Sequence, residues 1–373
     1  MELIAYERKL VQSRHRGCLL GGALGDALGY PIEFKTSASV IHRDHGTAAP
    51  AKLDYTGKGA LISDDTQMTL FTADGVVRSA LRFNEQGMCN AVLVLHRAYL
   101  RWLRTQQEPF VDRGPTTTDA EDGWLLKQRA LWARRAPGNT CLNSLISGQE
   151  YSTKNRANNS KGCGAIMRSA PIGMTPGFGR QVFELAVDAG ALTHGHPSGY
   201  LSAGYFASVI NSLVYGSTFF AALDTADNLI TSHEGHEEIA KLIVCVRELI
   251  AKGKPDVAAI ESLGGGWVGE EALAIALLCA ATVADATPQS VAEALWRSVA
   301  HKGDSDSTGS LTGNLLGAML GEACLPKAWL AELELAEVIR TCADDVFDAY
   351  HTERREWAGY QGHRIISRTI PLG

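Results

Sequence analysis

Residues 303–321 read GDSDSTGSLTGNLLGAMLG, an acidic, hydroxyl-rich segment followed by regularly spaced glycines. The glycines recur at every fourth position, namely 313, 317 and 321. A second ladder with the same spacing lies near the start of the chain, at Gly17, Gly21, Gly25 and Gly29. On a helix such positions share one face, and the missing side chains allow another backbone to approach closely. Glycine inside a helix costs roughly 0.5–1 kcal/mol relative to alanine, so its repetition indicates a packing requirement. We therefore expect two helices that cross at the centre of the fold.

The rest of the chain also favours helices. Apolar residues recur at intervals of three and four, and the sequence lacks the sustained apolar–polar alternation of half-buried strands. Further helical patterns cover residues 70–81, 88–104, 181–193, 199–223, 237–252, 270–284, 288–300 and 334–351. The longest irregular regions are 34–62 and 105–162. Helical segments joined by short glycine- and proline-marked turns predict an all-α fold, which we expect to be one compact domain over residues 1–373.

Composition excludes several classes of protein. The 373 residues are 45% hydrophobic and carry a formal net charge of -6, which gives no support for nucleic-acid or anionic-membrane binding. No charge-free stretch has the roughly 20 consecutive apolar residues of a membrane-spanning helix. The charged segment 1–17 lacks the apolar centre of a signal peptide, and the eight cysteines show no paired spacing. We therefore expect a cytoplasmic protein with reduced thiols.

The acidic segment at 304–307 has a counterpart in SDDTQMTLF at 63–71. Each segment places two carboxylates and hydroxyls directly before a helical pattern, and helix capping is the alternative explanation for either one alone. Carboxylates that pack together repel each other unless they are solvated, protonated or bridged by cations. Oxygen ligands favour Mg²⁺, Mn²⁺ or Ca²⁺, and four carboxylates suit two divalent ions about 3.5–4 Å apart. The candidate metal ligands are Ser63, Asp64, Asp65, Asp304, Asp306 and Ser307.

Several longer motifs accompany these two segments. They are GCLLGGALGDALGYPIEF, LISDDTQMTLFTADGVV, RAPGNTCL, NNSKGCGAIMRSAPIG, LTHGHPSG, GGGWVGEEALAIAL and GDSDSTGSLTGNLLGAMLG. In this order, over residues 16–322, the set resembles the ADP-ribosylglycohydrolase family. The resemblance implies a compact all-α fold with two central Mg²⁺ ions, for which Mn²⁺ could substitute, and the six residues above as ligands. It also implies that Glu33 lies on a mobile loop that closes over the metals.

The resemblance further implies a pocket for an ADP-ribosyl group. The loop SKGCGAIMR at 160–168 is similar to the family's glycine loop around the pyrophosphate, and its backbone N–H groups suit that task; a tight turn entering a helix is the alternative. Two histidines follow in THGHP, where a zinc site is disfavoured because no third soft ligand accompanies them. Trp267 would stack on adenine, unless it is only an exposed tryptophan at the edge of the core. The candidate substrate-binding residues are Ser160, Lys161, Gly162, Cys163, Gly164, Met167, Arg168, His194, His196, Gly266 and Trp267.

The reaction implied by the resemblance is hydrolysis of the N-glycosidic bond between ribose and a protein side chain. An ADP-ribosylated protein would be the substrate and ADP-ribose the product, and RAPGNTCL with SKGCGAIMR is closer to the arginine-specific branch of the family. Asp65 or Asp306 would accept the proton of the attacking water, or Glu33 would assist. The alternatives are a structural member similar to the lens crystallins, a reader that binds ADP-ribose without cleaving it, an immunity protein against an ADP-ribosyltransferase toxin, and another dinuclear hydrolase.

Overall fold

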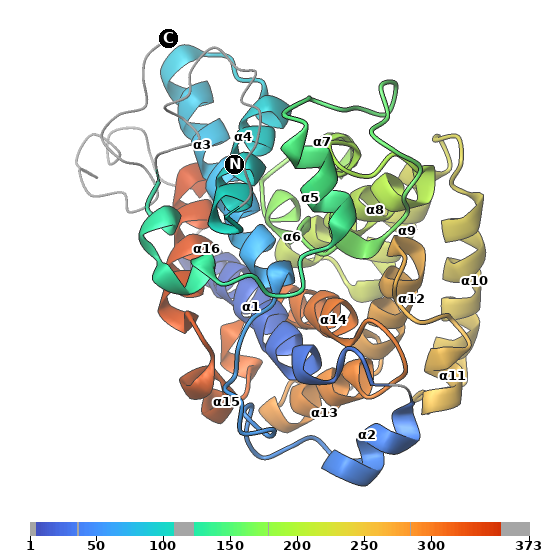
Figure 1. Cartoon of the computed structure of the whole chain (residues 1–373). Helices are drawn as coiled ribbons and strands as arrows, with labels where there is room; N and C mark the ends of the chain where they lie inside the picture. The colour runs from blue at the N-terminus through green and yellow to red at the C-terminus, as the bar shows by residue number, and fades with distance from the viewer. Residues whose placement is uncertain (1–4, 36, 108–122, 178, 284, 352–373) are drawn as a thin grey trace.

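Two long helices with matching glycine faces, α1 (Ala5–Gly29) and α14 (Ser305–Leu320), lie side by side through the middle of the molecule (Figure 1). They run antiparallel, so that Gly17 meets Gly317 and Gly29 meets Ser305. A Cβ atom on Gly17 would lie 2.5 Å from the carbonyl oxygen of Gly317, and those on the later glycines would be closer still. Only glycine permits this backbone-to-backbone contact, which confirms the expectation drawn from the two ladders. The ladder in α14 also includes Gly309, which faces Gly25 and which the sequence analysis did not assign to it.

The computed structural model describes residues 5–35, 37–107, 123–177, 179–283 and 285–351, and these residues form an all-helical globule. The other α-helices are α2 (Ala38–His45), α3 (Asp64–Gln86), α4 (Ala91–Thr105), α5 (Asn139–Ile146), α6 (Ala170–Gly173), α7 (Gly179–Ala191), α8 (Pro197–Val214), α9 (Phe219–Ile230), α10 (Glu237–Ala251), α11 (Val257–Glu261), α12 (Gly269–Ala280), α13 (Pro288–Val299), α15 (Lys327–Glu332) and α16 (Ala336–His351). Short 3-10 turns cover Tyr30–Ile32, Leu125–Lys127, Arg129–Trp132, Cys163–Ala165 and Glu322–Cys324.

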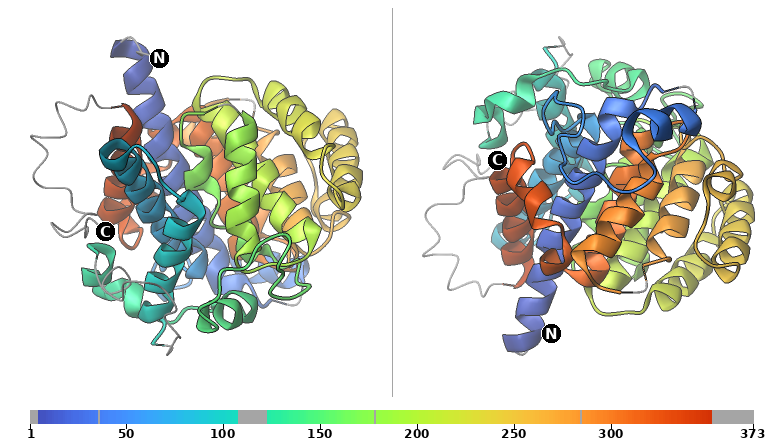
Figure 2. Two further views of the ribbon diagram at one scale, coloured as in Figure 1. Left: turned by 90° about the horizontal axis from the view of Figure 1, so that it is seen from above. Right: turned by 90° about the horizontal axis from the view of Figure 1, so that it is seen from below.

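The remaining helices surround the α1–α14 pair. Helix α16 packs along α1, whereas α12 and α13 cover α14, and α3 packs against α16 and α4 (Figure 2). Helix α8 also contacts α14, and it packs against α7, α9 and α12. Helices α3 and α14 are buried along most of their length because neighbours cover them on several sides. The first turns of both helices are therefore at the centre of the protein, where carboxylates are normally absent.

Most of the helical patterns in the sequence correspond to observed helices. The pattern at 70–81 lies within α3, and the patterns at 88–104, 181–193, 237–252 and 288–300 match α4, α7, α10 and α13 to within a few residues. These helices have a buried face and an exposed face, so their apolar residues repeat with the helical period.

The prediction of a single helix over residues 199–223 is wrong. The chain forms α8 and α9 instead, because Gly216 adopts a positive φ of 100° and Thr218 caps α9 by accepting a hydrogen bond from Ala221 N. Residues 216–218 of the turn are exposed, but apolar residues stand on both sides of them, at the end of α8 and at the start of α9. Such a run does not reveal where one helix ends and the next begins.

The two regions expected to be irregular contain short helices as well. Helix α2 lies within 34–62, and α5 and two 3-10 turns lie within 105–162. Helices of one or two turns carry too few apolar repeats for the pattern to be seen. Residues 108–122 of the second region, and residues 1–4 and 352–373 of the expected single domain, lie outside the described residues.

None of the described helices combines the length and the apolar character that crossing a membrane requires. All eight cysteines are free thiols, as the sequence predicts.

We predict that Gly21→Ala destabilises the protein by about 3 kcal/mol or more, because the new methyl group would overlap the carbonyl group of Gly313. Equilibrium unfolding in urea measures this loss. Gly177→Ala is the matched control, since a Cβ there would make only ordinary contacts, the nearest at 3.5 Å from Val182. Equal stability of the two variants would contradict close backbone packing of α1 against α14.

Candidate metal centre

The antiparallel pairing of α1 with α14 brings the end of α1 to the beginning of α14. The N-terminus of α3 meets them there, because Asp26 of α1 accepts hydrogen bonds from Ser63 N at 3.0 Å and Thr66 N at 3.1 Å. Two helix N-termini, each with partial positive charge, thus face one acidic cluster. The two acidic segments lie far apart in the sequence, at 63–65 and 304–307, and the fold brings them together.

The α3 segment is held by its own cap. The Ser63 hydroxyl accepts a hydrogen bond from Asp65 N at 3.2 Å, and Asp64 accepts one from Gly138 N at 3.4 Å. Asp65 is only 3% exposed, and its Oδ1 has no hydrogen-bond partner among the described residues. Helix capping therefore explains the position of the Ser63 side chain, but it does not explain why the Asp65 carboxylate is buried there.

The α14 segment has the same organisation. Asp304 is the N-cap and accepts a hydrogen bond from Ser307 N at 3.3 Å, and Asp306 accepts from the same N–H at 2.9 Å. Both aspartates are 3% exposed and Ser307 is 1% exposed. One N–H group thus serves two carboxylates, whereas a cap needs only one.

Glu33 lies directly after the 3-10 turn that follows α1. One carboxylate oxygen from each of Glu33, Asp304 and Asp306 falls in a group whose members all lie within 4.8 Å of one another. The Glu33 side chain is buried, and its Oε2 has no hydrogen-bond partner in the described part of the chain. Glu33 therefore belongs to the acidic cluster itself in this structure.

Asp26 is a member of the cluster that the sequence analysis did not select. It is fully buried, and its carboxylate accepts hydrogen bonds from the backbone of Ser63 and from the backbone and hydroxyl of Thr66. Burial and the charge of Asp306 raise the pKa of Asp26 to about 7. A charged residue within a glycine ladder was the signal that could have identified it.

Six carboxylates are thus buried within reach of one another's charge: Asp26, Glu33, Asp64, Asp65, Asp304 and Asp306. Burial, followed by mutual repulsion for most of them, raises the pKa of each, and that of Glu33 to about 10. In the described residues, the hydrogen-bond donors to these carboxylates are backbone N–H groups, hydroxyls and one thiol, with no arginine or lysine.

Bound cations would remove this repulsion. The unpartnered oxygens of Asp65 and Glu33 give direct evidence of unused ligand capacity. Carboxylate and hydroxyl oxygens are the ligands that Mg²⁺, Mn²⁺ and Ca²⁺ prefer. The residues present therefore fit hard divalent cations.

The loop at 160–168 lies against this cluster. Its Cys163 thiol contacts Asp304 Oδ2 at 2.7 Å, and Gly162 forms an isolated bridge with Val268. The loop is also tied down at its start, because His196 N donates to Ser160 O at 3.2 Å and Gly269 N donates to Lys161 O at 2.8 Å. Gly164 packs beside the His194 ring, where a Cβ would lie 3.1 Å from Cε1.

Lys161 is occupied by two ion pairs. Its ammonium group contacts Glu270 and lies 2.8 Å from Glu238 Oε2, and Glu238 also accepts a hydrogen bond from the Ser198 hydroxyl. The pKa of Glu238 falls to about 2, mainly because of the Lys161 hydrogen bond. The lysine thus joins the loop to α10 and α12, and a ligand phosphate would have to compete with two carboxylates for it.

The side chains of Arg168, His194 and Met167 are buried and do not reach the exposed surface of the loop. Arg168 is 1% exposed, donates to Thr193 Oγ1 at 2.7 Å, and lies 4.0 Å from the centre of the Tyr99 ring. His194 is also buried, which lowers its pKa to about 3. In this structure these side chains support the shape of the loop, while His196 caps α8 by accepting from Ser198 N at 3.1 Å.

Trp267 projects from the loop between α11 and α12 and is 46% exposed. It stacks on Phe34, the residue after Glu33, with ring centroids 6.1 Å apart and an angle of 24° between the rings. The preceding Gly266 has a positive φ of 77°, and Asp304 N donates to Gly265 O at 2.8 Å. The exposed aromatic pair therefore stands directly beside the acidic cluster.

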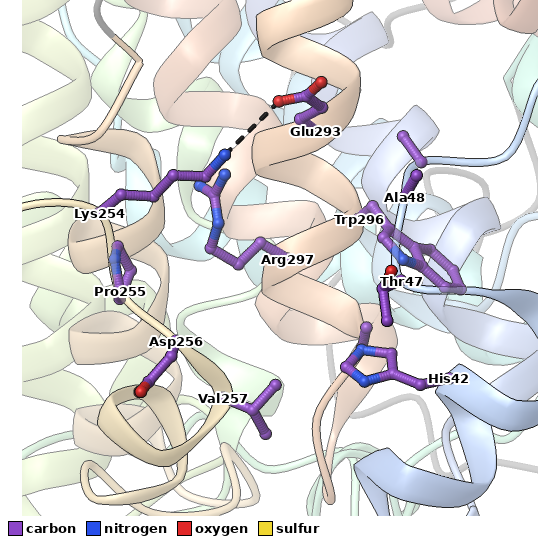
Figure 3. A pocket seen from close by; sticks show the side chains of 12 residues that line it. His42, Thr47, Ala48, Lys254, Pro255, Asp256, Val257, Glu293, Trp296 and Arg297 are labelled. Carbon is purple, nitrogen blue, oxygen red and sulfur yellow. Dashed lines mark ion pairs between the residues drawn. The ribbon is translucent and has the colours of Figure 1, made fainter.

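A separate pocket of about 410 Å³ lies between α2, α11 and α13 (Figure 3). Its lining includes His42, Lys254, Trp296 and Arg297, and Lys254 pairs with Glu293 at 3.6 Å. None of the candidate site residues lines it. The pocket is therefore distinct from the acidic cluster.

The model of one protein family, ADP-ribosylglycohydrolase, matches residues 7–356 of the chain. The chain belongs to the ADP-ribosylglycohydrolase family. This result confirms the resemblance read from the motifs and agrees with the all-helical fold.

Two curated relatives match this chain over most of its length. ADP-ribosyl-dinitrogen reductase glycohydrolase of Rhodospirillum rubrum is 23% identical over 87% of this chain and 92% of its own length. ADP-ribosylarginine hydrolase Tri1 of Serratia proteamaculans is 25% identical over 89% of this chain and 78% of its own length. A solved structure titled ADP-ribosylglycohydrolase-related protein complex shares the fold, with a TM-score of 0.63 and 21% identity over 92% of this chain and 99% of that chain.

We predict that divalent cations stabilise this family member against heat, and that Asp304→Asn changes the effect. At 100 times the dissociation constant, a bound cation adds about 2.7 kcal/mol. In EDTA the variant should melt at a higher temperature than the wild type, because one repelling charge is gone and asparagine still caps α14. The rise in melting temperature on adding Mg²⁺ or Mn²⁺ should be smaller for the variant than for the wild type. Thermal unfolding in both conditions measures this.

Asp74→Asn is the matched control. Asp74 is also a buried aspartate, but Arg78 Nε lies 3.0 Å from it and Arg101 contacts it as well. Its neutralisation should lower the melting temperature with EDTA and with metal alike, since it removes the buried carboxylate that pairs with Arg78 and Arg101. If Asp304→Asn behaved like Asp74→Asn, the acidic cluster would not be a cation site.

Proposed function

We propose that this chain is a metal-dependent ADP-ribosyl hydrolase that removes ADP-ribose from modified arginine side chains. The observation that carries the proposal is the buried cluster of six carboxylates in a member of this family. A non-catalytic structural protein has no need of buried charges that repel one another. The cluster therefore favours a catalytic centre over a structural role.

In this proposal Ser63, Asp64, Asp65, Asp304, Asp306 and Ser307 hold two Mg²⁺ or Mn²⁺ ions. When bound, these ions supply Lewis acidity and activate water. Gly138 N already fixes the carboxylate of Asp64, and Ser307 N fixes those of Asp304 and Asp306. Because the cap hydrogen bonds hold the ligands, binding requires little reorganisation of the side chains.

The protein's own groups then position the substrate. The glycine loop at 160–168 would present backbone N–H groups to the pyrophosphate, and Arg168 and His194 would hold the loop from behind. Asp65 or Asp306 would accept the proton of the attacking water as oxocarbenium character develops on the ribose. Glu33 lies in the same cluster and could assist, or protonate the leaving group, since its pKa is strongly raised.

Arginine as the acceptor rests on two supports. The first is the pair of motifs RAPGNTCL and SKGCGAIMR in the sequence. The second is the name of a relative that covers most of the chain, ADP-ribosylarginine hydrolase Tri1. Within this proposal the modified protein and a cognate ADP-ribosyltransferase toxin are the candidate partners. A reader that binds ADP-ribose without cleaving it is the alternative that turnover separates.

The direct test is release of ADP-ribose from an arginine-ADP-ribosylated protein. We expect release with Mg²⁺, none with EDTA, and a fall of at least 100-fold with Asp304→Asn, since the loss of a ligand removes several kcal/mol of transition-state stabilisation. A serine-ADP-ribosylated peptide is the matched substrate control and should be cleaved more slowly. Tight ADP-ribose binding without release from either substrate would indicate a reader.

Trp267 provides a second test of the proposed pocket. Stacking of a base on an aromatic ring contributes about 1–3 kcal/mol, so Trp267→Ala should raise KM about 5- to 150-fold with a smaller effect on kcat. Phe220→Ala is the control, because Phe220 is a similarly exposed aromatic residue (51%) on α9. If the two variants had equal KM values, Trp267 would not contact the substrate.

A further inference from the structure

A cysteine thiol stands inside the acidic cluster. The sequence predicts an all-oxygen ligand set, but the loop at 160–168 brings Cys163 Sγ to 2.7 Å from Asp304 Oδ2 and 3.4 Å from the Ser307 hydroxyl oxygen. The sulfur comes from a loop about 140 positions away from both partners in the sequence. The side chains gathered at the centre therefore include a sulfur as well as oxygens.

These separations are close to those of ligands that share one ion. A Zn–S bond of about 2.3 Å and a Zn–O bond of about 2.1 Å place the two ligand atoms roughly 3–3.6 Å apart at ordinary angles. The distance to Ser307 lies in that range, and the distance to Asp304 needs a shift of only a few tenths of an ångström. Three protein ligands with one open position are also the usual number around an accessible zinc ion.

A second observation points to a cation at the same place. Asp65, a member of the same acidic cluster as Asp304, is buried, and its Oδ1 has no hydrogen-bond partner among the described residues. The Cys163 residue itself is only partly buried. The thiol thus stands among carboxylates that have unused ligand capacity.

We propose that Cys163, Asp304 and Ser307 form a site for a thiophilic divalent cation such as Zn²⁺ or Cd²⁺, which competes with Mg²⁺ for the centre. On binding, the S–H bond breaks, the proton passes to solvent, and the sulfur donates an electron pair to the cation. No electron is transferred, and a chelator reverses the step. Thiolate sulfur favours zinc and cadmium, whereas Mg²⁺ requires oxygen ligands.

The consequence is regulation of the candidate centre by metal identity. A cation held by Cys163 would fix the loop at 160–168 to α14 and would occupy the space beside Asp304. The inference rests on the metal centre of the proposed function, and it predicts that Zn²⁺ opposes the effect of Mg²⁺ there.

The test is a titration of the metal-free full-length protein with Cd²⁺, followed by ultraviolet absorption. A cadmium–thiolate bond gives a charge-transfer band that oxygen ligands do not give. We expect the wild type to develop this band and Cys163→Ser to lose it, with a fall in Cd²⁺ affinity of at least tenfold. Affinity for Mg²⁺ should change much less, since serine supplies an oxygen ligand.

Cys141→Ser is the matched control. Cys141 belongs to the same region, but its thiol contacts Gly164 O and Arg168 and not the carboxylates. This variant should keep the band at wild-type intensity. A wild-type protein without the band, or a band that persists unchanged in Cys163→Ser, would overturn the proposal.

A second measurement needs no variant. Cys163 in the wild-type protein should be alkylated by iodoacetamide in EDTA or in Mg²⁺, and protected at least tenfold by Zn²⁺, as measured by peptide mass spectrometry. Equal alkylation in all three conditions would refute the proposal. Both measurements are made without substrate, so their outcome is distinct from that of ADP-ribose release, which tests the proposed function.

Discussion

The direct contact between the backbones of α1 and α14 is the constraint on which the rest of the structure depends. Because four positions on α1 lack a Cβ and meet carbonyl groups of α14, the two helices lie closer than side chains would permit. That contact also fixes their register, with Gly29 over Ser305. The end of α1 and the beginning of α14 are thereby held at one point. The acidic cluster lies at that point, with α3 completing it.

The position of the cluster brings several carboxylates close together in a buried site, where their charges repel one another. Buried carboxylates need counter-charges, and two buried aspartates of α3 show the contrast. Asp74 is neutralised by Arg78 and Arg101, whereas Asp65 keeps an unpartnered oxygen. Helix N-termini and backbone N–H groups reduce the repulsion within the cluster, but they supply no full positive charge. Bound cations would supply this missing charge under the proposed function.

The loops around the cluster connect it to the surface. Lys161 ties the glycine loop to α10 and α12, and Arg168 supports the loop from its buried side. Phe34 and Trp267 form an exposed aromatic pair that joins the Glu33 segment to the loop before α12. A ligand that bound to this aromatic pair would therefore contact both segments that flank the cluster.

The sequence by itself determined the helical fold and the two acidic segments. Glycine spacing predicts close helix packing because it depends on the absence of a Cβ, which is a local property. The acidic segments are recognisable because aspartates and hydroxyls stand at helix starts. Short helices such as α2 were not predicted because they contain too few apolar repeats, and the break at Gly216 was not predicted because apolar residues stand on both sides of it.

Only the tertiary structure decided which groups complete the centre. Asp26 faces α3 because of the rotation of α1 about its axis, and Cys163 reaches Asp304 because hydrogen bonds to α8 and α12 fix the path of its loop. Likewise, the structure shows that the Lys161 and Arg168 side chains are engaged by protein groups. Residue type and spacing do not indicate such long-range contacts. They depend on packing between segments that are distant in the chain.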